Sequence, residues 1–81
     1  MNEYITMDKL NIGETAVAVS IDGYRETVHR LADMGLVENA VVKCVGKSPL
    51  GDPAAYLISG AVIAIRSSDS YAIKVRRRNN G

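Results

Sequence analysis

Three residues of this sequence have side chains and positions suited to metal binding. His29 and Asp33 are four residues apart, so in a helix they would lie on one face and could share an ion. Cys44 is the only cysteine and a third candidate ligand. Because structural zinc sites use four protein ligands, the sequence predicts at most a weak site for Fe²⁺ or Zn²⁺ and no required cofactor. The simpler interpretation, which we favour, is a solvated helix face and a small buried cysteine.

Residues for catalysis are scarce. The chain has a single histidine, the side chain most often used in general acid–base chemistry. It contains no Ser/His/Asp or Cys/His set close together in sequence, no phosphate-binding loop and no paired-carboxylate motif. We therefore predict that the protein is not an enzyme.

The C-terminal cations form a basic cluster of Lys74, Arg76, Arg77 and Arg78. Such a cluster can contact phosphates, so a nucleic-acid-binding domain that uses this strand and tail is an alternative function. Stacking aromatic residues are missing from it, however, and the formal net charge of the chain is only +1. We favour a solubilising chain end and do not expect nucleic acid as the main partner.

The segment 48–53, Ser-Pro-Leu-Gly-Asp-Pro, predicts a stiff loop with an apolar tip. Its two prolines fix φ on either side of a glycine, and Leu50 lies in the turn. Leu50 either closes one mouth of the core or contacts a partner, which a loop ordered beforehand can do at little entropic cost. For a partner site we predict a groove between this loop and a helix. The residues of this predicted site are Tyr24, Met34, Pro49, Leu50, Gly51, Asp52 and Pro53.

The helix that would form the other side of this groove is predicted over Tyr24–Met34. Apolar residues recur there at helical spacing, and Asp22 is the expected N-cap. Gly35 is suited to the left-handed position after the last turn, where Leu36 can pack back on Leu31.

Five segments have the composition of strands, and one helix follows the first of them. The first strand alternates around Val17, Val19 and Ile21, and the last is expected to point Tyr71, Ile73 and Val75 inward. A polar turn is predicted at 67–70. This order indicates a mainly β fold, a small SH3-like barrel of about five strands; a five-stranded OB-type barrel is the alternative, but its helix usually comes later. The predicted strands are 14–21, 40–47, 54–59, 61–66 and 71–76.

Composition limits the remaining choices. The 81 residues suit a single domain, 1–81, with a core over about 8–76, and the hydrophobic fraction of 47% includes no Trp or Phe. One cysteine excludes an intrachain disulfide, and the lack of a signal peptide predicts a cytoplasmic protein. No apolar run approaches the ~20 residues that span a bilayer, so we expect no membrane insertion. With a net charge of +1, any binding to polyanions must be local.

Several segments together resemble one protein family. They are the helix end Arg30–Leu36, the 48–53 loop, Gly60–Arg66 and Ile73–Val75, and the likeness extends over roughly residues 8–76. They resemble the ferrous iron transport protein A (FeoA) family. Glu38-Asn39 stands where the family often has Pro-Gly, but asparagine tolerates positive φ and suits the same turn. Asp69-Ser70 stands just before the last predicted strand, where the family usually has an acidic residue followed by alanine.

The resemblance implies a small cytosolic accessory protein of ferrous iron uptake. Its partner would be a FeoB-like GTPase/permease, which it would bind through a cytosolic or membrane-proximal region and modulate. The same domain occurs in metal-dependent repressors of the diphtheria-toxin-repressor type, but 81 residues leave no room for their helix-turn-helix domain. A metal-binding regulatory domain is a further alternative, and pairing with a second copy through the apolar loop stays open.

Overall fold

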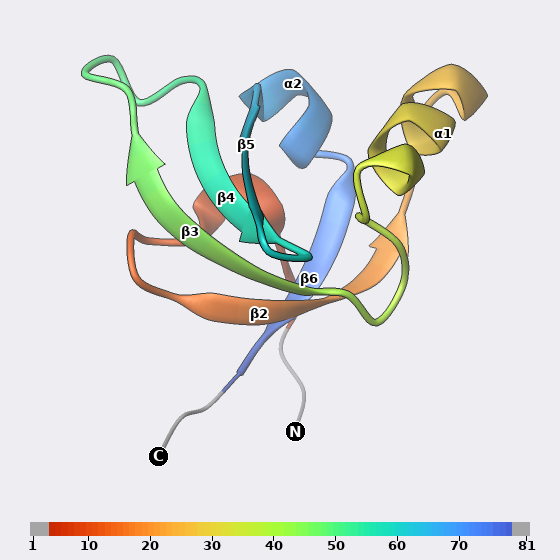
Figure 1. The fold of residues 1–81 in the computed structure, drawn as a ribbon, viewed down its shortest axis with the longest axis horizontal. Coiled ribbons are helices and arrows are strands. Elements are labelled where there is room, and N and C mark those ends of the chain that lie inside the picture. Colours follow the sequence, from red (N-terminus) through yellow and green to blue (C-terminus); the bar gives the residue numbers. More distant parts are fainter. Residues whose placement is uncertain (1–3, 79–81) are drawn as a thin grey trace.

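Six strands form one antiparallel sheet in the computed structural model, which describes residues 4–78 (Figure 1). The strand order across the sheet is β1-β6-β2-β3-β4-β5. The mainly β class and the short helix after the first long strand are as predicted. In chain order the elements are β1 (Tyr4–Thr6), the 3₁₀ turn η1 (Met7–Lys9), β2 (Thr15–Ile21), α1 (Arg25–Asp33), β3 (Val41–Lys47), β4 (Ala54–Ile58), β5 (Ala61–Ile65), α2 (Ser67–Ser70) and β6 (Ile73–Arg77).

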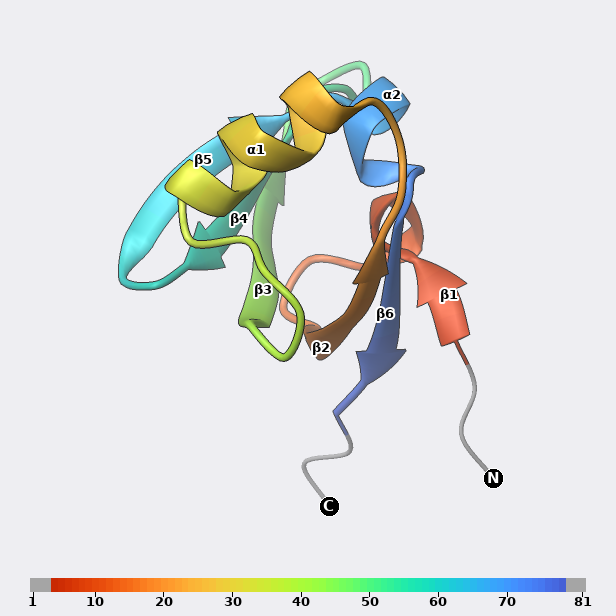
Figure 2. The same ribbon diagram turned by 90° about the vertical axis from the view of Figure 1, so that its right-hand side faces the viewer.

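The sheet curls around its core, so that β3, β4 and β5 stand opposite β1, β2 and β6 (Figure 2). It does not close: β1 and β5 are its two free ends. The prediction of about five strands missed β1, whose three residues are too few for a visible alternation pattern. The core consists of side chains from the inner face of the sheet and from η1, α1 and the residues that follow them. Among its members are Met7, Leu10, Leu31, Leu36, Val42, Tyr56, Ile58, Ile73 and Val75.

Strand β2 buries its alanines rather than its valines. Ala16 and Ala18 have no exposed surface, whereas Val17 and Val19 are only half-buried. Inward positions of small barrels often alternate small and large side chains, so methyl groups fit at the middle of the curl. A register shift between Ala18 and Ser20 then turns Ile21 toward the core, opposite Ile73. Of the predicted alternation, only Ile21 therefore packs on the core.

Helix α1 ends as the sequence predicts. Gly35 has φ of +94°, its N–H donates to the Ala32 carbonyl (2.9 Å), and the Leu36 N–H donates to the Leu31 carbonyl (2.9 Å). These two bonds define a Schellman motif, which places the apolar Leu36 beside the last turn. The start of the helix differs, because the N-cap is Tyr24 without a side-chain hydrogen bond, and the prediction of Asp22 is wrong.

The segment before the last strand also departs from prediction. The polar run 67–70 is one turn of α-helix, α2, and not a simple turn. Strand β6 begins at Ile73, so Tyr71 lies outside it and is 68% exposed. Ile73 and Val75 point inward as expected, and both are fully buried.

Candidate partner-binding loop

The loop between β3 and β4 presents an apolar residue to solvent. Leu50 is 95% exposed, the largest exposed fraction among the large apolar side chains of the described residues. A residue that closed the mouth of the core would be buried, so that alternative is wrong. Pro49 beside it is also exposed. The tip of the loop is therefore available for contact.

Backbone hydrogen bonds inside the loop hold its shape. The Ser48 N–H donates to the Pro53 carbonyl across the base (3.1 Å), and the Gly51 N–H donates to the Ser48 carbonyl over the tip (2.7 Å). Gly51 has φ of +87°, a conformation that glycine adopts without steric cost. The Asp52–Pro53 peptide bond is cis. The turn thus closes on itself within six residues.

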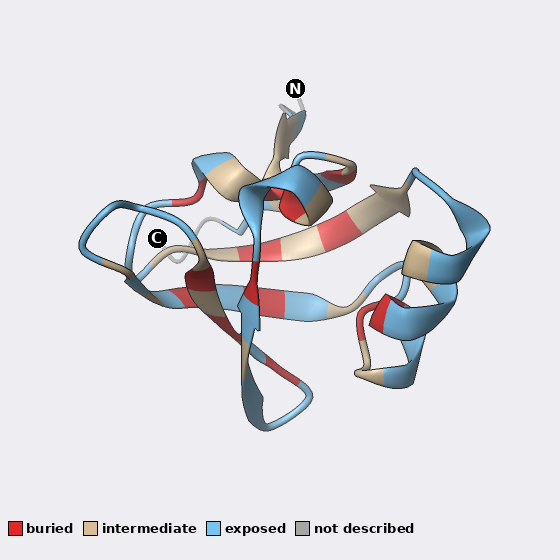
Figure 3. Cartoon of the chain, turned by 90° about the horizontal axis from the view of Figure 1, so that it is seen from above, coloured by how far each residue is buried: buried red, intermediate tan, exposed pale blue. Residues whose placement is uncertain are grey.

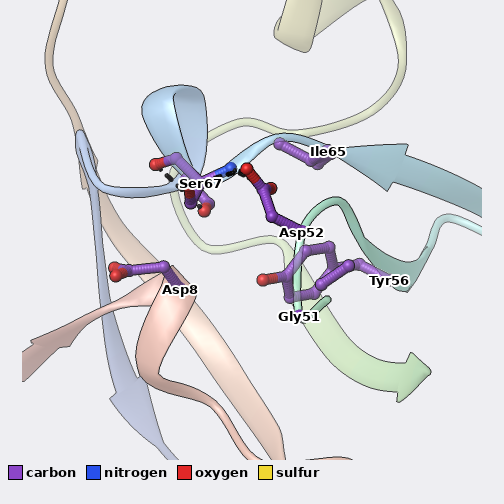
Figure 4. Close-up of a pocket in the computed structure, with 8 residues that line it drawn as sticks. Asp8, Gly51, Asp52, Tyr56, Ile65 and Ser67 are labelled. Atoms are coloured by element: carbon purple, nitrogen blue, oxygen red, sulfur yellow. Dashed lines mark hydrogen bonds between the residues drawn. The ribbon is translucent and has the colours of Figure 1, made fainter. Parts of the chain in front are cut away.

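Asp52 ties the base of the loop to α2 (Figure 4). Its carboxylate accepts the backbone N–H of Ser67 at 2.8 Å and the Ser67 hydroxyl at 3.1 Å. Ser67 is the first residue of α2, whose own N-cap, Arg66, makes no side-chain capping bond. Asp52 therefore caps this helix from a distant part of the chain, and the helix in turn fixes the loop. Asp52 was predicted in the site from the sequence, whereas Ser67 was predicted only as part of a polar turn.

A small polar cavity lies under the loop, lined in part by Asp8 of η1, Tyr56 of β4 and Ser70 of α2 (Figure 4). Its volume is about 20 Å³, enough for one water molecule. The Tyr56 hydroxyl donates to the Met7 carbonyl (3.3 Å), and burial raises the pKa of Tyr56 to about 12. One carboxylate oxygen of Asp8 is buried without a protein partner. The polar groups beneath the loop suit a structural role, because the space is too small for an organic ligand.

Helix α1, predicted to form the other side of the groove, does not lie beside the 48–53 loop. Helix α1 and the 48–53 loop lie at opposite ends of the longest dimension of the fold (Figures 1 and 3). Tyr24, at the start of α1, is 86% exposed, and Met34 packs partly against the core. The prediction that Tyr24 and Met34 join Leu50 in one groove is therefore wrong. Pro49 to Pro53 stay together as the candidate site.

The three metal-ligand candidates do not come together. Cys44 is fully buried on β3, as the simpler interpretation predicted, whereas His29 and Asp33 are exposed on α1. Within residues 4–78 no group of three or more His, Cys, Asp or Glu side chains is close enough to hold a metal ion. A weak ion site at His29 and Asp33 alone stays a prediction.

The basic cluster is distributed over two sides of β6. The Arg77 side chain pairs with Glu14 at 2.8 Å, while Lys74 and Arg76 alternate with the buried Ile73 and Val75 and so point away from the core. The Asn11 backbone N–H, at 2.7 Å, is the main cause that lowers the pKa of Glu14, and Arg77 adds to it. The carboxylate of Glu14 thus offsets one of the four cations.

The family is settled by a sequence match. The model of the FeoA domain matches residues 5–77, nearly the whole chain. The chain belongs to the FeoA family. No curated protein matches the chain significantly.

Solved structures of other FeoA proteins have the same fold. The FeoA protein of Chlorobium tepidum is 27% identical, with a TM-score of 0.89, over 95% of this chain and 73% of that one. A FeoA-like protein of Clostridium acetobutylicum is 25% identical, with a TM-score of 0.88, over 100% and 94% of the two chains. The FeoA of Stenotrophomonas maltophilia in complex with zinc is 25% identical, with a TM-score of 0.74, over 88% of each chain. It is described as an SH3 domain protein, so the SH3-like architecture predicted for this chain is confirmed.

No helix among residues 4–78 of this FeoA-family chain is long and apolar enough to cross a membrane.

Proposed function

We propose that this protein is an accessory protein of ferrous iron uptake that binds and modulates a FeoB-like GTPase/permease through its 48–53 loop. Membership of the FeoA family supports the link to iron transport. The S. maltophilia relative has itself been suggested to be a ferrous iron transport activating factor. The observation that carries the choice of surface is Leu50, 95% exposed at the tip of a loop whose base is fixed by Asp52.

Pre-ordering is what makes this loop suited to binding. Ordering a mobile side chain at an interface costs about 0.5–1.5 kcal/mol, and a mobile backbone costs more. Here the turn is already closed by its own backbone bonds and by the contact between Asp52 and Ser67. An apolar pocket on the partner would bury Leu50, and at about 25 cal/mol per Å² a fully buried leucine contributes roughly 1.5–3 kcal/mol.

The first test is binding of the purified chain to the cytosolic region of the FeoB-like permease from the same source. It is run at two salt concentrations, with and without guanine nucleotide, and the rate of GTP hydrolysis is followed in parallel. We expect saturable binding that survives moderate salt, since the proposed contact is apolar. Absence of binding in every nucleotide state would refute the proposed function.

Leu50→Asp tests the surface. We expect this variant to stay folded, because the side chain contacts solvent, and to bind at least roughly tenfold more weakly, as for an interface hot spot. The matched control is Ile12→Asp, which places the same charge at another exposed apolar position, 61% exposed and outside the loop. Equal binding by the two variants would exclude the loop as the contact.

Asp52 variants test whether the anchoring of the loop matters. Asp52→Ala removes both bonds to Ser67 while Leu50 is unchanged, so we expect weaker binding and a loss of stability of about 0.5–2 kcal/mol, as for other capping residues. Asp52→Asn keeps an oxygen acceptor for the Ser67 N–H and should retain most of the affinity. If Asp52→Ala binds as tightly as the native protein, pre-ordering is not part of the mechanism.

A further inference from the structure

The charges of this protein are separated by structural element. All five charged side chains in the strands are cations, Lys43 and Lys47 on β3 and Lys74, Arg76 and Arg77 on β6. The carboxylates of the described residues lie in helices, turns and loops. A net charge of +1 therefore conceals a sheet whose charged side chains are all cations, on β3 and β6.

The strand register gathers some of these cations among exposed or half-buried aliphatic side chains on the side of the sheet that points away from the core. In one row across the sheet, Val62 lies opposite Leu57, and Leu57 lies opposite Lys43. In the next row, Val41 lies opposite Val17, and Val17 lies opposite Arg76. Opposite residues on antiparallel strands have Cβ atoms only about 4.5–5.5 Å apart. We call these six residues the outward face.

Burial confirms the side on which these rows lie. Val42 and Cys44 on β3 and Tyr56 and Ile58 on β4 alternate with the outward residues and are buried in the core. The outward aliphatics keep much of their surface: Val62 is 64% exposed, Val41 46% and Leu57 38%. Tyr4, opposite Arg76 at the end of the second row, is 52% exposed. Apolar groups and cations are therefore exposed to solvent side by side on the outward face.

We propose that the outward face docks on an anionic phospholipid surface. Cations attract the lipid headgroups, and aliphatic side chains between them gain by entering the boundary between headgroups and acyl chains. Because the sheet is curled, the outward face is convex, and its two rows meet on β3 at Val41 and Lys43. The polar cavity described above is lined by Tyr56 and Ser70 among others, and by none of the six residues of the outward face.

Two other partners, a nucleic acid and a second copy of the chain, fit the outward face less well. A phosphodiester backbone would use the cations but not the aliphatics, and single-stranded nucleic acid binds to stacking aromatics that this face lacks, except for Tyr4 at its edge. On a second copy of the chain, α1 is no acidic counterpart, because Arg25 and Arg30 lie on it beside Glu26 and Asp33. The outward face includes no residue of the 48–53 loop, so the two proposed contacts can hold or fail separately.

The test is co-sedimentation of the full chain with vesicles of phosphatidylcholine, with and without an equal part of phosphatidylglycerol, at low and high salt. We expect binding only to the vesicles with phosphatidylglycerol, weakened by salt. The double variant Lys43→Gln/Arg76→Gln should lower the partition coefficient roughly fivefold per cation removed. The matched control, Lys9→Gln/Arg25→Gln, removes the same charge from exposed positions off the sheet and should have much less effect.

Two further measurements separate the apolar contribution from the electrostatic one. Val62→Gln leaves every charge in place, so a loss of vesicle binding at low salt would report burial of the aliphatic side chain. A single-stranded oligonucleotide is titrated with the same variants. The proposal is overturned if the native chain does not bind the anionic vesicles at low salt, or if both double variants weaken binding equally. Tighter, face-dependent binding of the oligonucleotide would assign the face to nucleic acid instead.

Discussion

At the scale of single residues, Tyr56 is a buried hydrogen-bond donor that lines the polar cavity under the loop. The side chain is 1% exposed, and its hydroxyl donates to the Met7 carbonyl. Burial is the main cause that raises its pKa to about 12, because the charged phenolate would lose its hydration; Asp8 and Asp52 add to the effect. The hydroxyl therefore stays a hydrogen-bond donor at any physiological pH.

We predict that this shift makes the protein lose stability at alkaline pH. In the unfolded chain the tyrosine ionises near 10.0, whereas in the folded chain it holds its proton to about 12. Between these values the folded state binds more protons, so the free energy of unfolding falls as pH rises. Denaturant titrations from pH 9 to 12 measure this slope. Tyr56→Phe removes it, at a pH-independent cost of about 0.5–1.5 kcal/mol for the lost hydrogen bond; an unchanged slope in this variant would contradict the prediction.

At the scale of elements, the end of α1 and the turn between β4 and β5 approach so closely that only glycine fits between them. A Cβ on Gly35 would lie 2.5 Å from the Ser59 hydroxyl oxygen and 3.0 Å from the Ser59 Cβ. Gly35 also has φ of +94°. This residue thus serves both as the end of the helix and as a contact between distant parts of the chain.

Gly35→Ala and Gly13→Ala separate these two roles. Both glycines have φ of +94°, but a Cβ on Gly13 would meet no atom within 4 Å. We expect Gly13→Ala to cost about 1–2 kcal/mol for the left-handed backbone alone. Gly35→Ala should cost clearly more, because Ser59 must also move. Denaturant midpoints measure the difference, and equal losses would mean that the close approach to Ser59 carries no energetic weight.

At the scale of the whole molecule, α1 contributes few buried side chains to the core. It lies at one end of the fold, and its only fully buried side chain is Leu31 (Figure 3). Arg30 adds an ion pair with Asp69 of α2 at 3.1 Å, but the pair is exposed to solvent and such pairs contribute little. By contrast, β6 is paired on both sides, by β1 and β2. We therefore expect the helix to open locally more readily than the central strands.

Amide hydrogen exchange tests this order of stability. We predict that the amides of α1 exchange well before those of Ala18 on β2 and Val75 on β6. Leu31→Ala, which should cost about 2–5 kcal/mol as a core truncation, should accelerate exchange mainly in α1. The control Val75→Ala, in the doubly paired strand, should lower protection throughout the sheet. Uniform acceleration by both variants would show that α1 opens only with the rest of the molecule.

The sequence by itself determined the features that depend on a few neighbouring residues. Gly35 and Leu36 specify the helix end, and Asn39 adopts the positive φ of 73° that its residue type favours. The prolines and glycine of the 48–53 loop likewise predict a stiff turn. Each of these is a local backbone preference, so no distant contact is needed to decide it.

Only the tertiary structure decided which of these features share a surface. The bond from Ser67 to Asp52 spans 15 residues, and the rows of the outward face depend on the register of five strands. The tertiary structure also decides that Ala16 and Ala18 are buried in place of the valines and that Leu50 is exposed to solvent. It places α1 at the end of the fold opposite the 48–53 loop. Such outcomes follow from how the curled sheet fills its interior, a balance over the whole chain that no short segment contains.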